Sequence, residues 1–284
     1  MPELPEVETV RRHLAACLPD QRIVGVDLRR EDLRYPIPVR EVQALVGATL
    51  HDVRRRAKYL LLDAKLPRGL PRVVLVHLGM SGRLFHEVGE PPEWRLHEHF
   101  RFRLTGDHGP SVLRYVDPRR FGALDVMLAR DEPTHPLLAS LGPEPLDDLT
   151  AAGLAQQAQT CRIAVKAFLM DSQRVVGVGN IYASEACFHA GVHPLRPACS
   201  LSLAEWQRLV VGVREVLLAA IRAGGSTLRD FVGGDSMPGS YQQEFAVYGQ
   251  AGAPCRRCPP RNHAVVERVV LGTRATYFCG GCQK

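Results

Sequence analysis

Hydrophobic residues recur at helical spacing near the start of the chain and then change to a shorter period. Between residues 6 and 18 the apolar positions fall three or four apart, which predicts one amphipathic helix. The runs that follow are short, β-branched or aromatic, and separated by Gly, Pro and Asp, as is typical of strands. They cover residues 22–30, 58–64, 72–80, 99–105, 111–117 and 122–128. Because no helical pattern intervenes, we expect a β-sandwich or barrel over residues 1–131.

The second half of the chain returns to the helical period. Ser202 fits an N-cap with Glu205 as its capping-box partner, and the apolar positions continue up to Gly224, a helix stop. A shorter helix is expected over residues 180–191, with Asn180 as its cap. The stretch 130–137 contains two prolines and is the best candidate for a domain boundary.

Composition narrows the class of partner. The chain has 284 residues, more than one core usually organises, so about two domains are expected. Lys and Arg number 36 against 30 for Asp and Glu, and the formal charge of +6 favours an anionic partner. The sequence contains no apolar run of the roughly 18 residues that a membrane span requires, and it opens with no signal-peptide pattern. We therefore expect a soluble, cytoplasmic protein.

Four of the eight cysteines stand in two CxxC pairs near the C-terminus. Two such pairs, separated by 20 residues, can bring four thiolates around one Zn²⁺, with the intervening residues folded as a hairpin. Such a site has no open coordination position, so the zinc would be structural. The expected ligands are Cys255, Cys258, Cys279 and Cys282. Arg274 would lie on that hairpin, either aimed at a phosphate or exposed on a solvated face.

Glycines and basic segments favour a nucleic-acid backbone as the anionic partner. Gly177 and Gly179 precede a predicted helix, and a glycine-lined helix start exposes N–H groups that can hold a phosphate. A plain packed turn fits the same residues. Basic segments lie at 54–58, 117–122 and 254–258. One basic run is usually a solvated face, whereas three of them together indicate a groove that follows DNA or RNA.

The opening "MPELPEVETV" allows two interpretations. Pro2 has no N–H and a fixed φ, so it suits the first turn of a helix. If Met1 is removed, Pro2 instead carries a free secondary amine beside the carboxylate of Glu3, and that amine would be a nucleophile.

Taken together, "PELPEVET", "RRAKYLLL", "HLGMSGRL", "DPRRFG", "GVGNIYASE" and the terminal cysteine pairs resemble the formamidopyrimidine-DNA glycosylases, bacterial base-excision repair enzymes. The resemblance runs in order from Pro2 to Lys284. It implies an α+β protein with an N-terminal β-sandwich, a helix-two-turn-helix domain and a four-cysteine zinc finger, over residues 1–131, 132–240 and 241–284. It also implies a monomer that removes formamidopyrimidines and 8-oxoguanine from double-stranded DNA, cleaves abasic sites, and works at the nucleoid.

The resemblance assigns catalytic roles to five residues. Pro2 would attack C1′ of the sugar and hold it as an iminium ion, since an α-amino group with a pKa near roughly 8 is partly unprotonated at neutral pH. Glu3 would move protons, with Glu6 one turn further on in the same site. Lys58 would assist β-elimination and Arg274 the δ-elimination. A surface lysine at a strand end is the ordinary alternative for Lys58.

The resemblance also implies a set of DNA contacts. Met80 and Phe121 would be wedges that fill the space of an extruded nucleotide, and Arg119 would hydrogen-bond the orphaned cytosine. Methionine and phenylalanine side chains more often fill cores. The segments "GMSGR" and "PRRFG", which carry Met80 and Phe121, are expected to form loop tips, where such side chains are exposed. The other expected contacts are His77, His97, Arg162, Lys166 and Asn180, and either histidine can instead be structural.

The sequence leaves open which damaged bases the protein acts on and whether it is an enzyme at all. Residues 226–245 would form a mobile lesion-recognition loop, in which Ser240 replaces a bulkier residue, so the preference among oxidised purines is open. The endonuclease VIII branch shares the architecture and acts on oxidised pyrimidines. A zinc-dependent DNA-binding regulator without catalysis, in which Pro2 only starts a helix, is the third hypothesis.

Overall fold

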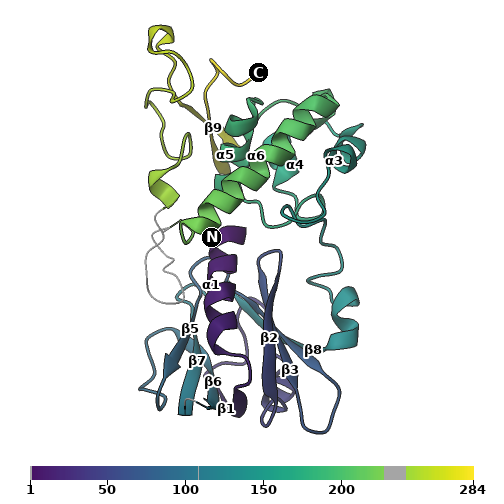
Figure 1. The fold of residues 1–284 in the computed structure, drawn as a ribbon, viewed down its shortest axis with the longest axis vertical. Helices are drawn as coiled ribbons and strands as arrows, with labels where there is room; N and C mark the ends of the chain where they lie inside the picture. The colour runs from purple at the N-terminus through teal and green to yellow at the C-terminus, as the bar shows by residue number, and fades with distance from the viewer. Residues whose placement is uncertain (1, 108, 227–240) are drawn as a thin grey trace. The chain divides into compact units, whose positions relative to one another are not determined.

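The computed structural model describes residues 2–107, 109–226 and 241–284. These residues form two compact units, namely residues 2–139 with 224–226, and residues 140–223 with 241–284 (Figure 1). Of the recognition loop expected at 226–245, residues 227–240 lie outside the described residues. The expected division into three domains stays a prediction.

Antiparallel strands form the β part of the first unit. Their order is β5-β7-β6-β1-β2-β3-β4-β8, which leaves β5 and β8 at the ends, so the sheet does not close into a barrel. Between the described residues of β1 and β2, a single register pair, Arg22 with Thr49, joins two four-stranded halves. These halves are the layers of the expected β-sandwich. The strands are β1 (Arg22–Leu28), β2 (Thr49–Arg56), β3 (Tyr59–Lys65), β4 (Arg72–His77), β5 (Arg83–Val88), β6 (Glu98–Gly106), β7 (Gly109–Val116) and β8 (Ala123–Leu128).

The core of the first unit draws on both halves and on one helix. Phe102 of one half and Leu62 of the other are buried in the same cluster. Because alternate residues of a strand point to opposite faces, each strand places one apolar set inside. Helix α1 (Leu4–Cys17) adds an apolar face that includes Val10 to this cluster. The helix predicted over residues 6–18 is therefore confirmed.

The hydrophobic pattern does not predict β2 and β5, in which polar and charged residues interrupt the apolar ones. In β2, the guanidinium of Arg54 pairs with Asp63 at 2.7 Å and with Glu132 at 2.8 Å. Arg55 pairs with Glu8 of α1 at 3.2 Å. These arginines of the basic segment in β2 therefore serve the fold, which weakens that segment as evidence for an anionic partner.

Helices dominate residues 140–223 of the second unit. Helix α6 (Leu203–Arg222) begins at Ser202, whose Oγ accepts the N–H of Glu205 at 3.3 Å, and it ends before Gly224, where φ is 75°. The predicted capping box and stop are both confirmed. The remaining helical elements are α2 (Val39–Gln43), α3 (Ala151–Ala158), α4 (Val165–Leu169), α5 (Asn180–Ala190), η1 (Ala129–Thr134), η2 (Ala198–Ser200), η3 (Tyr241–Gln243) and η4 (Pro260–Asn262).

Helix α5 has the predicted span but a different cap. Gly179 is the N-cap, with an extended backbone, and Asn180 is the first helical residue, so the expectation of an asparagine cap is wrong. The helix ends at Gly191, which has a φ of 68° that glycine adopts readily. As a result, the side chain of Asn180 does not cap its own helix and is available for the contacts described below.

The C-terminal segment forms the expected hairpin. Strands β9 (Glu267–Leu271) and β10 (Arg274–Phe278) pair in antiparallel register around a two-residue turn. The buried carboxylate of Glu185 in α5 anchors the chain that leads into this segment. It accepts, at 2.7–2.9 Å, the backbone N–H groups of Ala246, Val247 and Tyr248.

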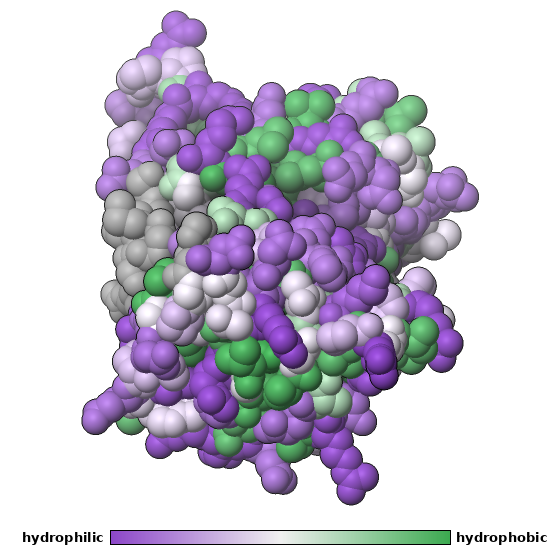
Figure 2. Space-filling view, turned by 60° about the horizontal axis from the view of Figure 1, so that its bottom comes forward, coloured by the Kyte–Doolittle hydropathy of each residue, from purple (hydrophilic) through white to green (hydrophobic). Residues whose placement is uncertain are grey.

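The described surface is mostly polar. In the view of Figure 2, polar side chains cover most of the face, and apolar ones form smaller groups in both its lower and its upper half. Large exposed apolar residues include Val24 on a strand and Phe121 on a loop. None of the described helices combines the length and apolar character needed to cross a bilayer.

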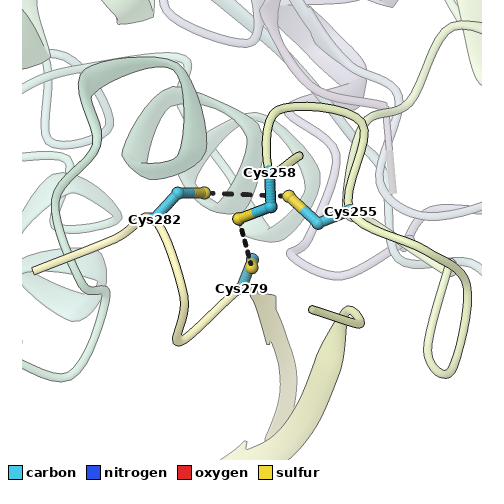
Figure 3. Close-up of side chains that lie close together, drawn as sticks. All are labelled: Cys255, Cys258, Cys279 and Cys282. Atoms are coloured by element: carbon cyan, nitrogen blue, oxygen red, sulfur yellow. Dashed lines mark hydrogen bonds between the residues drawn. The ribbon is translucent and has the colours of Figure 1, made fainter. Parts of the chain in front are cut away.

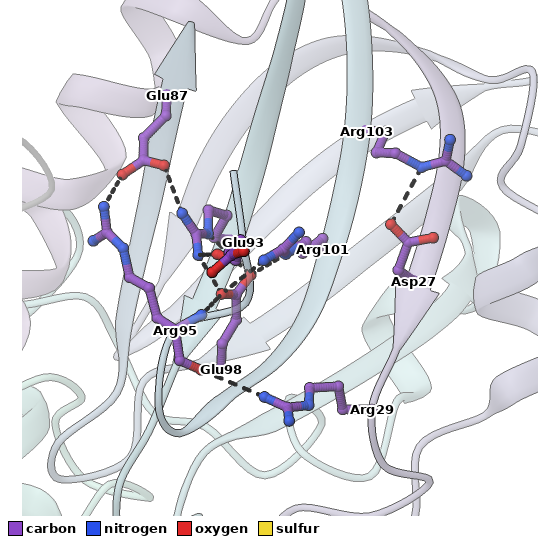
Figure 4. A network of polar contacts seen from close by, with 9 residues as sticks. Asp27, Arg29, Glu87, Glu93, Arg95, Glu98, Arg101 and Arg103 are labelled. Carbon is purple, nitrogen blue, oxygen red and sulfur yellow. Dashed lines mark hydrogen bonds and ion pairs between the residues drawn. The ribbon is translucent and has the colours of Figure 1, made fainter. Parts of the chain in front are cut away.

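A buried network of ion pairs stabilises β5, β6 and β7 (Figure 4). The carboxylate of Glu98 is fully buried and accepts hydrogen bonds from Arg101, Arg114 and the backbone N–H of Arg95. Arg114 is also fully buried and reaches Glu87 at 2.8 Å. Burial alone would raise the pKa of Glu98, but the guanidinium groups hold it below its usual value. Glu98 is therefore held as a carboxylate by its hydrogen-bond partners.

We expect Arg114→Met to lower the free energy of unfolding by about 3 kcal/mol, because it removes the partner of a buried carboxylate. Arg103→Met is the matched control, since Arg103 pairs with Asp27 at 3.2 Å while 44% and 36% exposed, respectively. An exposed pair of this kind contributes about 1 kcal/mol or less. Urea unfolding followed by circular dichroism measures both variants, and equal losses would contradict the prediction.

Candidate active site

Acidic residues follow Pro2 in the opening segment, and their surroundings differ. Pro2 and Glu3 precede α1 and are both buried. The N–H of Glu3 donates to Oε2 of Glu6 at 2.8 Å, which fixes the backbone next to Pro2. Glu8 pairs instead with arginines of α1 and β2. Burial alone would raise the pKa of Glu8, but these arginines lower it, so Glu8 has a structural role.

Glu6 ties the start of α1 to residues 224–226. Its side chain is fully buried, and Oε1 accepts both the N–H and the Oγ–H of Ser226 at 2.8 Å each. Gly225 beside it has a φ of 81°, and a Cβ there would lie 3.2 Å from the Glu6 side chain. With the bond from Glu3, three hydrogen bonds engage this carboxylate and hold it in one orientation.

The packing of α1 on β2 brings Lys58 to the same end of the unit as Pro2. Two contacts set the register, Arg11 to the carbonyl of Val53 at 3.4 Å and Glu8 to Arg55 at 3.2 Å. The helix and the strand therefore run in opposite directions, and the start of α1 lies beside the end of β2. Lys58 lies in the turn that follows β2, and Figure 1 shows this turn and the start of α1 at the same end of the sandwich.

His77, at the end of β4, borders the same turn. Burial lowers the pKa of His77 to about 4, and the positive charges of Lys58 and Arg34 contribute to the same shift. The imidazole is therefore neutral near pH 7. Its Nδ1 accepts the N–H of Gly79 at 3.2 Å, and the ring makes a second hydrogen bond with the backbone of Phe121. His77 thus links the loop after β4 to the loop after β7.

These two loops pack directly on each other. Gly79 has a φ of 68°, and a Cβ there would lie 2.4 Å from the carbonyl carbon of Phe121. A Cβ on Gly122 would lie 1.7 Å from Oη of Tyr115. Both distances are far below van der Waals contact, so glycine is required for the loops to approach this closely. Met80 and Phe121 adjoin these glycines.

Asp117 is fully buried and hydrogen-bonds to both loops. Oδ1 accepts the hydroxyl of Ser81 at 2.6 Å and the N–H of Arg119 at 3.2 Å. Oδ2 accepts the N–H of Gly122 at 2.9 Å and the hydroxyl of Tyr115 at 3.1 Å. Asp117 opens the motif "DPRRFG", but the motif assigns it no role of its own. The available signal is an aspartate before a proline turn, where the side chain commonly accepts the N–H two residues on.

Predicted DNA-contact residues stand around Asp117. Arg119 and Phe121 are exposed, and the Arg119 guanidinium lies 4.8 Å from the centroid of the Phe121 ring. Met80 is partly exposed. His97 is exposed with a φ of 62°, and its carbonyl accepts the N–H of Asp117 at 2.9 Å. Apolar and cationic side chains are therefore presented together on loops with a rigid base.

In the second unit, Lys166 and Asn180 form a hydrogen-bonded group with β10. Lys166 is 1% exposed, and its Nζ donates to Oδ1 of Asn180 at 2.6 Å, to Oγ1 of Thr276 at 2.8 Å and to the carbonyl of Ala275 at 3.0 Å. An ammonium has three hydrogens, so these bonds engage all of them. Because Oδ1 of Asn180 accepts, its Nδ2 is the donor, here to Oη of Tyr248 at 3.4 Å.

Arg274 and Arg162 are both exposed. Arg274 is the first residue of β10 and lines a depression of about 330 Å³ between α4 and the hairpin turn. Arg162 precedes α4. By contrast, Arg256 and Arg257 donate to backbone carbonyls at 3.4 and 3.1 Å, so the basic segment 254–258 contributes to the fold itself.

The four paired cysteines converge as the spacing predicts (Figure 3). Their Sγ atoms all lie within 4.8 Å of one another, with 3.7 Å between Cys255 and Cys282 and 3.8 Å between Cys258 and Cys279. Four thiolates at about 2.3 Å from one tetrahedral zinc lie about 3.8 Å apart, so these residues fit such a metal. Against the effect of burial, backbone N–H groups of Cys258 and Arg257 lower the pKa of Cys255, whereas burial and the neighbouring sulfur atoms raise the pKa of Cys258 and Cys282.

Comparison with protein families matches most of the chain. Residues 1–124 match the Formamidopyrimidine-DNA glycosylase N-terminal domain, and residues 141–232 match the Formamidopyrimidine-DNA glycosylase H2TH domain. A formamidopyrimidine-DNA glycosylase of Xanthomonas euvesicatoria pv. vesicatoria is 49% identical over 285 residues, covering 100% of both chains. One from Aromatoleum aromaticum is also 49% identical with the same coverage.

Solved structures share the whole fold. The MutM (Fpg) protein of Thermus thermophilus is 38% identical and has a TM-score of 0.84, covering 99% of this chain and 98% of that one. A mutant of Lactococcus lactis Fpg in complex with Fapy-dG-containing DNA is 27% identical, with a TM-score of 0.86 and 100% coverage of both chains. Lactococcus lactis Fpg bound to DNA with an abasic site has a TM-score of 0.85 at 27% identity, covering 99% of both chains.

We expect Asp117→Asn to loosen both loops, because an amide nitrogen would replace one of the two oxygens that accept hydrogen bonds. The amides of Arg119 and Gly122 should exchange with solvent roughly tenfold faster, the equivalent of about 1.4 kcal/mol. Hydrogen exchange read by mass spectrometry measures this. Asp52→Asn is the control, since Asp52 is exposed and accepts the N–H of the adjacent Val53. Unchanged exchange in the Asp117 variant would contradict the assignment.

His77 should make stability fall at acidic pH. Its pKa is about 4 in the folded protein and roughly 6.5 when unfolded, so its contribution is complete above pH 6.5 and is lost as the pH falls toward 4. Between pH 7 and 4.5 this loss should reach about 2–3 kcal/mol. His77→Gln should lose correspondingly less over that range in urea unfolding. Parallel pH profiles for the two proteins would contradict the prediction.

Proposed function

The chain is a member of the formamidopyrimidine-DNA glycosylase family, and on this premise we propose that it excises formamidopyrimidines and 8-oxoguanine from duplex DNA. It is a base-excision DNA glycosylase and abasic-site lyase. One observation carries the residue assignment: the buried Pro2–Glu3 pair lies at the end of the first unit that also carries Lys58. The Lys58 turn in turn borders His77 and the two glycine-packed loops.

Pro2 is the proposed nucleophile. Once Met1 is removed, its secondary amine attacks C1′ of the damaged nucleotide, the bond from C1′ to the base breaks, and the opened sugar is held as an iminium ion. With a pKa near roughly 8, part of this amine is unprotonated at neutral pH. Glu3, the next residue, transfers the protons required for ring opening and elimination. Lys58 assists β-elimination from the turn after β2.

Glu6 is a positioning residue in this proposal. Its carboxylate accepts hydrogen bonds from Glu3 and from two groups of Ser226, so it orients the backbone of Glu3 and the segment at residues 224–226. A group held in three hydrogen bonds is poorly suited to carry protons through a reaction, since each transfer would break one of them. Proton transfer therefore falls to Glu3.

Met80, Arg119 and Phe121 fill the space of the extruded nucleotide. Extrusion costs a few kcal/mol of stacking, which inserted side chains partly replace. The Arg119 guanidinium against the Phe121 ring supports this role, because both groups are flat and can stack on bases. Arg119 then donates hydrogen bonds to the orphaned cytosine.

Residues of both units hold the DNA backbone in this proposal. His97, Arg162 and Arg274 are exposed donors, and Arg274 also engages the phosphate that leaves in δ-elimination. Nδ2 of Asn180 donates to a phosphate. Lys166 acts indirectly, because its hydrogens orient Asn180 and hold β10, the strand that carries Arg274.

The four cysteines hold one structural Zn²⁺ in this proposal. Thiolate ligands and the spacing of the sulfur atoms support zinc over a harder cation such as Mg²⁺. The metal stabilises the hairpin that presents Arg274 and takes no part in the chemistry. We further propose a monomer that acts on the double-stranded DNA of a bacterial chromosome, with functional domains at residues 1–131, 132–240 and 241–284.

Oxidised pyrimidines are the second candidate substrate class. Lactococcus lactis Fpg, 27% identical to this chain, has been solved with DNA containing an oxidised pyrimidine. Single-turnover release from duplexes with 8-oxoguanine or thymine glycol distinguishes the two classes. Faster release of thymine glycol would favour this second candidate.

The nucleophile is tested by borohydride trapping on a duplex with an abasic site. The chain should become covalently attached through residue 2, and Pro2→Gly should abolish most of the adduct. Glu3→Gln should slow excision by roughly 100-fold or more, because it removes a general acid–base group. Glu8→Gln is the matched control on the same helix and should retain activity. Full trapping by the Pro2 variant would contradict the assignment of Pro2 as nucleophile, whereas no trapping by the wild-type chain would contradict the proposal as a whole and favour a DNA-binding regulator.

A further inference from the structure

Two cysteines outside the four-cysteine site lie on neighbouring backbones of the second unit. Ala164 and Pro197 form an isolated antiparallel bridge between the starts of α4 and η2, flanked by the hydrogen bonds from Val165 N–H to the Arg196 carbonyl at 2.8 Å and from Ala198 N–H to the Ile163 carbonyl at 2.9 Å. At the end of this pairing, the N–H of Cys199 donates to the carbonyl of Cys161 at 2.9 Å. The two cysteines are therefore directly adjacent, although 38 positions separate them in the sequence.

The backbone geometry suits a disulfide. One backbone hydrogen bond of this length brings the two Cα atoms to about 5–6 Å, within the roughly 4.4–6.8 Å that disulfides span. Both residues are also accessible, since Cys199 is exposed and Cys161 is partly exposed. Cys17 and Cys187 differ, because burial raises the pKa of their thiols to about 11 and about 12 and makes them inert.

We propose that Cys161 and Cys199 form a reversible disulfide when the protein meets hydrogen peroxide. The more exposed Cys199 loses its thiol proton, and its sulfur attacks one peroxide oxygen; the O–O bond breaks, a sulfenic acid forms, and the leaving hydroxide takes up the thiol proton to give one water. The thiol of Cys161 then attacks the sulfenic sulfur, which releases a second water as the S–S bond forms. Peroxide is reduced by two electrons and the two thiols are oxidised. A dithiol reductant reverses the step.

The disulfide acts on the neighbouring residue, Arg162. Closing the bond fixes the backbone of Cys161 and so redirects the exposed Arg162 side chain that follows it. This effect rests on the proposed function, in which Arg162 contacts DNA. The oxidised protein should therefore bind DNA roughly 5- to 10-fold more weakly, the loss expected for one backbone contact. Peroxide, which generates the lesions, would thereby also tune the enzyme that removes them.

The test treats the full-length, zinc-loaded protein with increasing hydrogen peroxide, followed by alkylation and peptide mapping without reduction. We expect a cross-linked peptide pair joining residues 161 and 199, lighter by two hydrogens than the free peptides, at doses that release no zinc. Affinity for a duplex with an abasic-site analogue should fall in parallel and recover with dithiothreitol. Cys199→Ser should prevent both changes, whereas Cys17→Ser, the control, should prevent neither.

Two outcomes overturn different parts of the proposal. If peroxide modifies the two cysteines separately and no cross-link forms, the disulfide itself is refuted. If the cross-link forms and affinity does not change, its effect on Arg162 is refuted. Arg162→Ala in the untreated protein separates this from the proposed function, because unchanged DNA binding in that variant would show that Arg162 makes no contact in the first place.

Discussion

Buried carboxylates that accept hydrogen bonds from uncharged donors hold the candidate active site of the first unit and the chain that leads into the hairpin of the second. Asp117 accepts two hydroxyls and two backbone N–H groups, and Glu6 accepts from the backbone and side chain of Ser226. Glu185 accepts three consecutive backbone N–H groups. A hydrogen bond to a charged acceptor contributes about 1.5–3 kcal/mol and is directional, so a few of them can fix a short loop that has little core of its own.

Carboxylates that pair with arginine serve a different purpose. Glu98 with Arg114, and Glu8 with Arg55, join whole strands and helices through groups with long side chains. The uncharged donors around Asp117 are instead mostly backbone or short side chains, which define atomic positions more tightly. The two kinds of acid explain how one unit combines a stable sandwich with loops whose exposed side chains keep a fixed geometry.

Local signals made much of this fold predictable, whereas long-range partners did not. The caps of α6, the apolar face of α1 and the hairpin between the cysteine pairs each depend on residues close in sequence, and all are confirmed. Nζ of Lys166 donates a hydrogen bond to Thr276, 110 positions away in the sequence, and Asp117 accepts one from Ser81, 36 positions away. No spacing rule reveals such pairs. The same limit concealed β2, whose arginines look solvent-directed until Asp63 and Glu132 lie beside them.

The contact between Gly79 and Gly122 also limits how this enzyme can diversify. Neither position has room for one additional carbon atom, so the main chain next to Met80 and Phe121 cannot be remodelled by simple substitution. At the loop tips, Met80 is partly exposed and Arg119 and Phe121 are exposed, so their side chains can vary more freely. Mutant libraries aimed at new lesions should therefore vary the tips and keep both glycines invariant, because new selectivity can arise there only through side-chain chemistry.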